Sequence, residues 1–236
     1  MPGDLLRRLA AEPRRAAILL DVDGTLAPIV EQPEDARVPE ETRHALARLA
    51  SRYALVACVT GRASADAERL VGVPGVAVVG EHGLELASDA AAWSDRISKF
   101  AAGVDWPAER KPLSVSFHFR RAQDEAAARA YLTRVEEAAR AEGLVPRWGR
   151  MVLEVRPPVE ANKGTAVVAL VQRANVSRAL YAGDDTTDLD AFAGLDGLEL
   201  GVRVAVDSPE APPPLLAAAD VVVEGTDGVL ALLREL

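Results

Sequence analysis

The chain has 236 residues, enough for one large domain or two modest ones, and a hydrophobic fraction of 49% that can supply a core. The formal net charge of −9 argues against nucleic-acid binding, because phosphate backbones attract basic proteins. The single cysteine, Cys58, excludes an internal disulfide and suits a reducing, cytoplasmic setting. No apolar stretch approaches the roughly 18 residues that a membrane helix needs, so we expect no membrane association.

The first part of the chain alternates apolar strands with helical patterns. We expect a strand at 17–22, a helix at 40–51, a strand at 53–59, a helix at 63–71 and a strand at 76–79. The short unbroken apolar runs are typical of strands that are buried on both faces. Alternation of this kind predicts a parallel sheet with helices on both faces.

The middle of the chain has a different character. Residues 113–120 alternate polar and apolar side chains, which is typical of a strand with one covered and one open face. A long helix at about 123–142 and short strands near 144–148 and 151–156 follow. This segment is therefore expected to be a small α+β domain with an antiparallel sheet.

The strand and helix alternation then resumes. We expect a helix at 163–174, a strand at 178–182, a helix at 187–194, a strand at 220–223 and a helix at 226–235. The predicted fold is thus α/β, with a doubly wound, Rossmann-like parallel-sheet core formed by residues 1–99 and 161–236. The smaller α+β domain, residues 100–160, is inserted into it.

Two carboxylates stand two residues apart where the first expected strand ends. Residues i and i+2 of a strand point the same way, so Asp21 and Asp23 should lie side by side. Two like charges about 4 Å apart repel by roughly 4 kcal/mol at an intermediate dielectric. A cation or a shared proton must offset that repulsion, and open α/β sheets bind their ligands at this edge.

Three further polar loops follow strands or begin helices. The segment Thr60-Gly61-Arg62 offers a hydroxyl and backbone N–H groups at a helix start, which suits a phosphate. The segment Asn162-Lys163-Gly164 combines a helix N-cap with a mobile positive charge. The acidic run 183–188 supplies the oxygen ligands that Mg²⁺ prefers.

Each of these motifs also has a plainer interpretation. Asp-x-Asp-Gly is often only a turn, Thr-Gly-Arg can simply begin a helix, and a lone lysine is usually a solvated charge. An acidic run at a helix start is favoured by the helix dipole alone. A parallel sheet would nevertheless gather all four loops at one edge, and that convergence favours a single phosphate and metal site.

Taken in order, these segments resemble the four motifs of the haloacid dehalogenase superfamily of phosphotransferases. Within that superfamily, further segments are similar to the trehalose-6-phosphate phosphatases: Gly80-Glu81-His82-Gly83, Glu109-Arg110-Lys111, Ser114–Arg120 and Glu154-Val155-Arg156-Pro157. The resemblance spans about residues 17–230. One departure is Leu189, where the family commonly has an acidic residue; it lies beyond the presumed metal ligands, so we expect little effect on catalysis.

The resemblance implies an aspartyl-phosphate mechanism with Asp21 as the nucleophile and Asp23 as the general acid and base. It implies that the phosphoryl group is held by Thr60, Gly61 and Lys163. Mg²⁺ would be held by Asp21, the backbone carbonyl of Asp23 and Asp184, with Asp185 and Asp188 supporting these ligands from behind.

The resemblance also implies that the inserted domain is a mobile cap that selects the sugar. The period of two places Ser114, Ser116, His118 and Arg120 on one face of their strand, although such a face can be merely solvated. The implied substrate-binding residues are Arg62, Glu81, His82, Lys111, His118, Arg120 and Glu154.

The expected function is Mg²⁺-dependent hydrolysis of trehalose 6-phosphate, a small-molecule substrate, by a monomeric enzyme. One alternative keeps the chemistry and changes the substrate to sucrose phosphate or a glycosyl-phosphoglycerate. Another is a non-catalytic domain that binds a sugar phosphate, but the chain retains both Asp21 and Asp23, which counts against it.

Overall fold

The computed structural model describes residues 2–30, 32–149 and 151–236, and it divides into two compact units. Unit 1 comprises Met1–Leu86 and Ala161–Leu236, and unit 2 comprises Ala87–Glu160. The sequence pattern predicts that the inserted domain begins at residue 100, whereas unit 2 begins at Ala87. The physical reason is helix α4 (Ser94–Ala102), whose apolar side packs against the sheet of unit 2.

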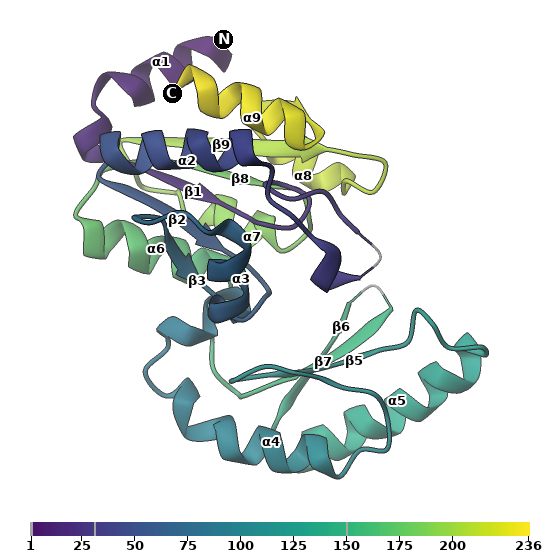
Figure 1. Cartoon of the computed structure of the whole chain (residues 1–236). Coiled ribbons are helices and arrows are strands. Elements are labelled where there is room, and N and C mark those ends of the chain that lie inside the picture. The colour runs from purple at the N-terminus through teal and green to yellow at the C-terminus, as the bar shows by residue number, and fades with distance from the viewer. Residues whose placement is uncertain (1, 31, 150) are drawn as a thin grey trace. The chain divides into compact units, whose positions relative to one another are not determined.

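Unit 1 is built on a six-stranded sheet with the strand order β10-β9-β8-β1-β2-β3 (Figure 1), and every neighbouring pair is parallel. Its strands are β1 (Ala16–Leu20), β2 (Leu55–Val59), β3 (Ala77–Val79), β8 (Arg178–Gly183), β9 (Leu200–Asp207) and β10 (Val221–Glu224). Leu20 lies opposite Cys58 of β2 and Ala182 of β8. These three strands therefore end at nearly the same level.

Helices cover both faces of this sheet (Figure 1). One face packs against α1 (Pro2–Ala11), α2 (Glu40–Arg52) and α9 (Gly225–Glu235), and the other packs against α6 (Lys163–Ala174), α7 (Asp188–Ala193) and α8 (Pro213–Ala218). Strand β1 shows how: Ile18 and Leu20 belong to the first apolar cluster, whereas Ala17 and Leu19 belong to the second. Because both faces are buried, the strand is apolar throughout, and the expected doubly wound fold is confirmed.

Five helices and strands of the described structure lie outside those expected from the sequence: α1, α4, α8, β4 and β9. Strand β9 is an inner strand between β8 and β10. Its buried residues alternate at Leu200, Val202, Val204 and Val206, with partly exposed Gly201 and Arg203 between the first three. That alternation is a usable strand signal.

Unit 2 contains a four-stranded antiparallel sheet in the order β4-β5-β7-β6. Its strands are β4 (Glu109–Arg110), β5 (Val115–His118), β6 (Val145–Gly149) and β7 (Val152–Arg156). Helices α4 and α5 (Glu125–Ala141) supply Phe100 and Leu132 to a core shared with Phe117 and Leu153. Strand β5 is shorter than the expected 113–120, and Arg120 lies exposed in the turn that follows it.

None of the described helices combines the length and the apolar character of a membrane span. The helix that matters most for the polar loops is α6, which begins with a capping box. The Asn162 side chain accepts a hydrogen bond from the Thr165 backbone N–H at 2.9 Å, and the Thr165 hydroxyl oxygen accepts one from the Asn162 N–H at 3.0 Å. This arrangement fixes the first helical residue, Lys163.

We predict that Asn162→Ala lowers the free energy of unfolding by about 1 kcal/mol, because the cap acceptor is lost. Asn162→Asp keeps an acceptor oxygen and should retain most of that stability. Urea denaturation followed by circular dichroism measures both variants, and equal stability of Asn162→Ala and the unchanged chain would contradict a stabilising cap.

Candidate active site

The polar loops of unit 1 lie at one edge of its sheet. They follow the carboxyl ends of β1, β2, β3 and β8, and the first turn of α6 joins them. Parallel strands bring their carboxyl ends together, which is why ligands of open α/β sheets bind there. The loops are Asp21–Ala27, Thr60–Arg62, Gly80–Gly83 and Gly183–Asp188.

Lys163 is the cation at the centre of this edge, with only 2% of its surface exposed. Its ammonium group donates to Asp188 Oδ1 at 2.6 Å and lies 3.0 Å from Asp21 Oδ2. Burial lowers the pKa of Lys163, but the charges of Asp188 and Asp21 more than offset it and raise the pKa above its ordinary value. Lys163 is therefore held charged between two carboxylates.

Asp188 is fully buried and accepts four hydrogen bonds. Its Oδ1 receives Lys163 Nζ and, at 2.7 Å, the hydroxyl of Tyr181, while its Oδ2 receives the backbone N–H groups of Asp184 and Asp185 at 3.0 and 2.9 Å. A carboxylate has about four acceptor positions, so Asp188 is saturated by protein donors. It is built to hold the lysine and the loop after β8.

Tyr181 was not among the expected site residues. It lies in β8, fully buried, two residues before Gly183. Burial is the main cause that raises the pKa of Tyr181, and the charge of Asp188 adds to it, so the phenol stays a neutral donor. The available signal was a tyrosine in an otherwise apolar strand just before an acidic loop, since a buried phenol needs a hydrogen-bond partner.

The site carries an excess of negative charge. Carboxylate oxygens of Asp21, Asp184 and Asp188 lie within 4.8 Å of one another, so three carboxylates and one ammonium leave a net charge of −2. Burial raises the pKa of Asp184 to about 7, with the charge of Asp188 as the next cause. Burial also raises the pKa of Asp21 well above its ordinary value, although Lys163 opposes the rise. Both directions indicate that the ionised site lacks positive charge.

A divalent cation fits this site. Asp21 Oδ1 is buried and has no hydrogen-bond partner among the described residues, an arrangement that is costly unless a ligand binds the atom. The Asp184 carboxylate lies against Gly24, where a Cβ atom would stand 2.0 Å from Asp184 Oδ2. Because Asp188 is saturated, Asp21 and Asp184 are the carboxylates of the cluster that remain able to bind a metal.

Asp23 takes a different partner from Asp21. Strand β1 ends at Leu20, so the alternation of side chains does not extend to Asp23. The Asp23 side chain is 40% exposed and pairs with Arg62, whose Nε and Nη2 donate to Oδ2 and Oδ1 at 2.7 Å each. Arg62 Nη1 also donates to the Pro33 carbonyl at 3.0 Å.

The loops after β2 and β3 support each other through their backbones. The Glu81 N–H donates to the Arg62 carbonyl and the His82 N–H donates to the Thr60 carbonyl, both at 2.8 Å. Glu81 and His82 have positive φ angles of 49° and 54°, which non-glycine residues seldom adopt. A Cβ on Gly61 would lie 2.6 Å from His82 Nε2, so only glycine fits against that ring.

A further residue outside the expected set, Glu85, ties these two loops together. Its carboxylate oxygens accept hydrogen bonds from the backbone N–H groups of Ser64 and Gly80, each at 3.0 Å. No sequence pattern indicates this role, because a single glutamate in a loop is usually solvated.

The polar face of the unit 2 sheet carries a separate cluster of charges. Lys111 Nζ lies 3.9 Å from Glu109 and 3.8 Å from Glu154, and His118 Nε2 lies 2.8 Å from Glu109 Oε2. Arg156 Nε lies 4.0 Å from Glu154 Oε2. Of the unit 2 residues expected to bind substrate, Lys111, His118 and Glu154 thus gather in one cluster, which Glu109 links.

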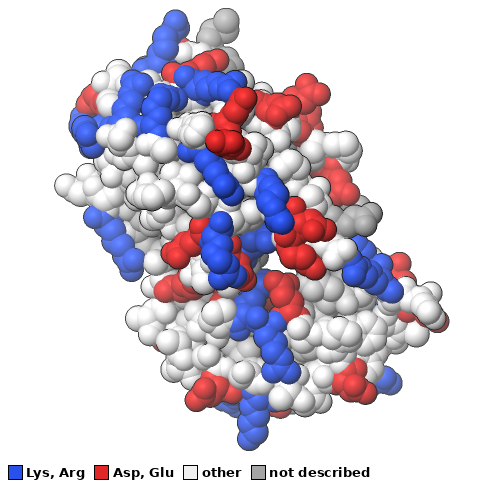
Figure 2. All heavy atoms as spheres, viewed as in Figure 1, with Lys and Arg blue, Asp and Glu red and all other residues white. Residues whose placement is uncertain are grey.

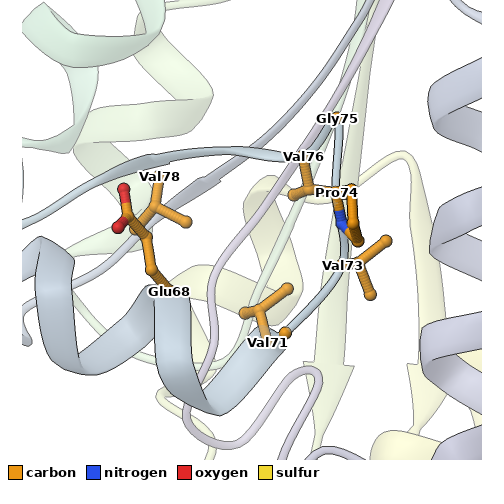
Figure 3. A pocket seen from close by; sticks show the side chains of 8 residues that line it. Glu68, Val71, Val73, Pro74, Gly75, Val76 and Val78 are labelled. Carbon is orange, nitrogen blue, oxygen red and sulfur yellow. The ribbon is translucent and has the colours of Figure 1, made fainter.

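The structure also has a hollow of about 310 Å³ beside α3 (Ser64–Val71) and β3 (Figure 3). Valines and a proline form most of its lining, and it contains none of the expected site residues. It therefore bears no relation to the charged loops described above.

Comparison with known proteins agrees with this geometry. The family model described as "Trehalose-phosphatase" matches residues 19–107 and 102–212. A trehalose-phosphate phosphatase of Mycobacterium bovis is 34% identical over 94% of this chain, which spans only 63% of that relative's length. The C-terminal domain of a trehalose-6-phosphate phosphatase from C. albicans superposes with a TM-score of 0.76 at 24% identity, covering 98% of this chain and 95% of that one. A haloacid dehalogenase-like hydrolase from Bacteroides thetaiotaomicron has the same fold, with a TM-score of 0.63 at 16% identity and coverage of 93% and 98%.

We predict that Asp188→Ala lowers the free energy of unfolding by about 3–5 kcal/mol, because it removes a partner from a buried ion pair and from two backbone donors. Tyr181→Phe removes one hydrogen bond to a charged group and should cost about 1.5–3 kcal/mol. The control is Asp185→Ala at an exposed neighbouring acid, which should change stability by less than about 0.5 kcal/mol. Urea denaturation measures all three, and equal effects of Asp188→Ala and Asp185→Ala would contradict the assigned network.

Proposed function

Because this chain belongs to the trehalose-phosphatase family, we propose that it hydrolyses trehalose 6-phosphate to trehalose and inorganic phosphate. The observation that carries this proposal is the buried Asp21, which has one oxygen beside Lys163 and the other without a hydrogen-bond partner in the described part of the chain. A carboxylate held in this way is oriented, and its second oxygen remains available to a metal or to phosphorus. The chain spans only 63% of the length of its Mycobacterium bovis relative. The proposal therefore concerns the activity of these 236 residues and not that of a longer protein.

In the first step the Asp21 carboxylate attacks phosphorus, a new P–O bond forms, and the bond from phosphorus to the sugar oxygen breaks. The leaving oxygen takes the electron pair of that bond and a proton from Asp23, so that trehalose departs as a neutral alcohol. The products of this step are trehalose and a phosphorylated Asp21.

In the second step a water molecule attacks the phosphorus of the phosphorylated Asp21. Asp23, now ionised, accepts the proton of that water, and the P–O bond to Asp21 breaks. Inorganic phosphate leaves and Asp21 is again a carboxylate. The two steps together consume one water molecule and return Asp23 to its protonated form.

Lys163 and the loop after β2 would stabilise the charge of the transferring group. The lysine is fixed by Asp188, so its position requires no rearrangement when the reaction begins. Thr60 and Gly61 belong to a loop that backbone hydrogen bonds hold against residues 80–83, and they would donate to the phosphoryl oxygens. Such preorganised donors are the main source of catalysis in phosphoryl transfer.

The cation that best suits this site is Mg²⁺, because it prefers oxygen ligands and leaves part of its shell to water and phosphate. Asp21, Asp184 and the backbone carbonyl of Asp23 would hold it, with Asp185 and Asp188 behind them. A bound Mg²⁺ would balance the net charge of −2 and act as a Lewis acid toward the phosphoryl oxygens.

The sugar would be recognised by residues of unit 2, which we propose to be a substrate-selecting cap. Lys111, His118 and Glu154 offer both donors and acceptors, as a polyhydroxylated substrate requires. Arg120, Glu81 and His82 complete the proposed set by their likeness to the family. A second unit that closes over a site also excludes bulk water from the reaction.

A small molecule, rather than a polymer, is the proposed partner. Figure 2 shows Lys and Arg side chains interspersed with Asp and Glu over the face in view, without a continuous basic surface there. Nucleic-acid binding relies on such a surface. We further propose that the protein acts as a monomer in the cytoplasm, a reducing compartment that suits the buried thiol of Cys58.

We predict that Asp21→Asn lowers phosphate release from trehalose 6-phosphate to less than about 10⁻³ of the original rate, because the nucleophile is lost. The assay uses a panel that includes sucrose phosphate and a glycosyl-phosphoglycerate, with Mg²⁺ or with EDTA. Asp227→Asn, at an exposed acid of α9, is the matched control and should keep full activity. Turnover by Asp21→Asn, or equal turnover in EDTA, would refute the mechanism.

We predict that Lys111→Ala raises KM for trehalose 6-phosphate about 10–100-fold, since a hydrogen bond to a charged group is worth about 1.5–3 kcal/mol. Its kcat/KM for p-nitrophenyl phosphate, which has no sugar, should stay unchanged. Lys99→Ala at an exposed position of α4 serves as the control. If Lys111→Ala lowered kcat/KM equally for both substrates, the lysine would have no role in sugar recognition.

A further inference from the structure

The pairing of Arg62 with Asp23 uses the whole guanidinium group. Nε and Nη2 donate to the two oxygens of one carboxylate, each at 2.7 Å, and Nη1 donates to the Pro33 carbonyl at 3.0 Å. All three nitrogens of Arg62 are therefore engaged. The Arg62 side chain is 18% exposed, whereas that of Asp23 is 40% exposed, so the arginine is the better-buried member of the pair.

This geometry fixes the plane of the Asp23 carboxylate. A forked, bidentate pair between guanidinium and carboxylate defines the orientation of both groups, which a lysine with its point charge does not do. Without such a partner, a carboxylate that is 40% exposed would turn freely toward water. General acid and base catalysis depends on a carboxyl group that is already directed at the reacting oxygen.

We propose that Arg62 is a positioning residue for Asp23 and acts on the reaction through that carboxylate, rather than by binding the phosphoryl group. This inference rests on the proposed function, because it requires that Asp23 exchange protons with the leaving oxygen and with water. It differs from the role in substrate binding that the family likeness implies for Arg62. It also explains why the third residue of the Thr60–Arg62 loop is an arginine.

The pairing has a consequence for the first step. One oxygen of Asp23 must face the leaving sugar oxygen, and each oxygen accepts one hydrogen bond from Arg62. Each carboxylate oxygen has a second acceptor position, so the fork can keep the carboxylate oriented while one oxygen exchanges a proton with the sugar oxygen. The contact of Nη1 with Pro33 keeps the arginine in place during this exchange.

The experiment compares an alkyl phosphate with p-nitrophenyl phosphate for Arg62→Gln and Arg62→Lys. The value of kcat/KM covers the steps up to phosphoryl transfer, and p-nitrophenolate leaves without the proton that an alkoxide needs. We expect kcat/KM for trehalose 6-phosphate to fall at least about tenfold in both variants, and at most by the roughly 10²–10⁴-fold that general acid catalysis contributes. For p-nitrophenyl phosphate the fall should be less than about threefold, and inhibition by inorganic phosphate should be unchanged.

Three controls make the result specific. Asp23→Asn should show the same selective loss, and adding Arg62→Gln to Asp23→Asn should cause no further loss, because both act on one step. Arg69→Gln removes an arginine from an exposed ion pair with Asp66 on α3 and should leave both activities unchanged. Circular dichroism verifies that each variant is folded.

Three outcomes would overturn the proposal: an equal loss on both substrates with weaker phosphate inhibition, near-complete activity of Arg62→Lys, or additive losses in the double variant. The first outcome would indicate that Arg62 binds the phosphoryl group. If the unchanged chain cleaves another alkyl phosphate of the panel instead of trehalose 6-phosphate, the proposed substrate is wrong and the same comparison is made with that ester. A chain that cleaves neither class of ester would refute the proposed function and this inference together.

Discussion

One ammonium group among three buried carboxylates governs the chemistry of this protein. Lys163 contacts Asp21 and Asp188, and its position depends on the capped start of α6 and on the donors that saturate Asp188. The charge that Lys163 leaves uncompensated, −2 in all, is the reason a divalent cation suits the site. The proposed nucleophile Asp21, the carboxylates that could bind a metal and Lys163 thus share a single electrostatic balance, and removing one of them changes the others.

Much of this site could be predicted from the sequence because a parallel sheet converts order along the chain into proximity. Asp21, Lys163 and Asp184 are far apart in the chain, yet each follows a buried strand or begins a helix, and the sheet brings these ends to one edge. The doubly wound fold was predictable for the same reason. The pattern that predicts the other strands is an unbroken apolar run, and in strand β9 glycine and arginine interrupt that run although the buried residues alternate.

The side-chain partners could not be predicted, because they depend on tertiary geometry that no spacing encodes. The i, i+2 rule expected Asp21 and Asp23 to share one environment, but β1 ends before both, and they pair with Lys163 and Arg62 respectively. Tyr181 and Glu85 hold the loops through hydrogen bonds to Asp188 and to the Ser64 N–H group, and neither residue belongs to a recognisable motif. The start of unit 2 at Ala87 likewise depends on how α4 packs, which its amphipathic pattern alone does not reveal.

The insertion of unit 2 between β3 and α6 has a consequence for the order in which the site is made. Strand β1 lies in the middle of the sheet, but one of its neighbours, β8, is synthesised only after the whole of unit 2. A growing chain that has reached residue 160 holds Asp21 without its ammonium partner, Lys163, and leaves one side of β1 without a hydrogen-bonding strand. The site is therefore assembled only after unit 2 has been synthesised, when the second segment of unit 1 completes a sheet that the first segment cannot close by itself.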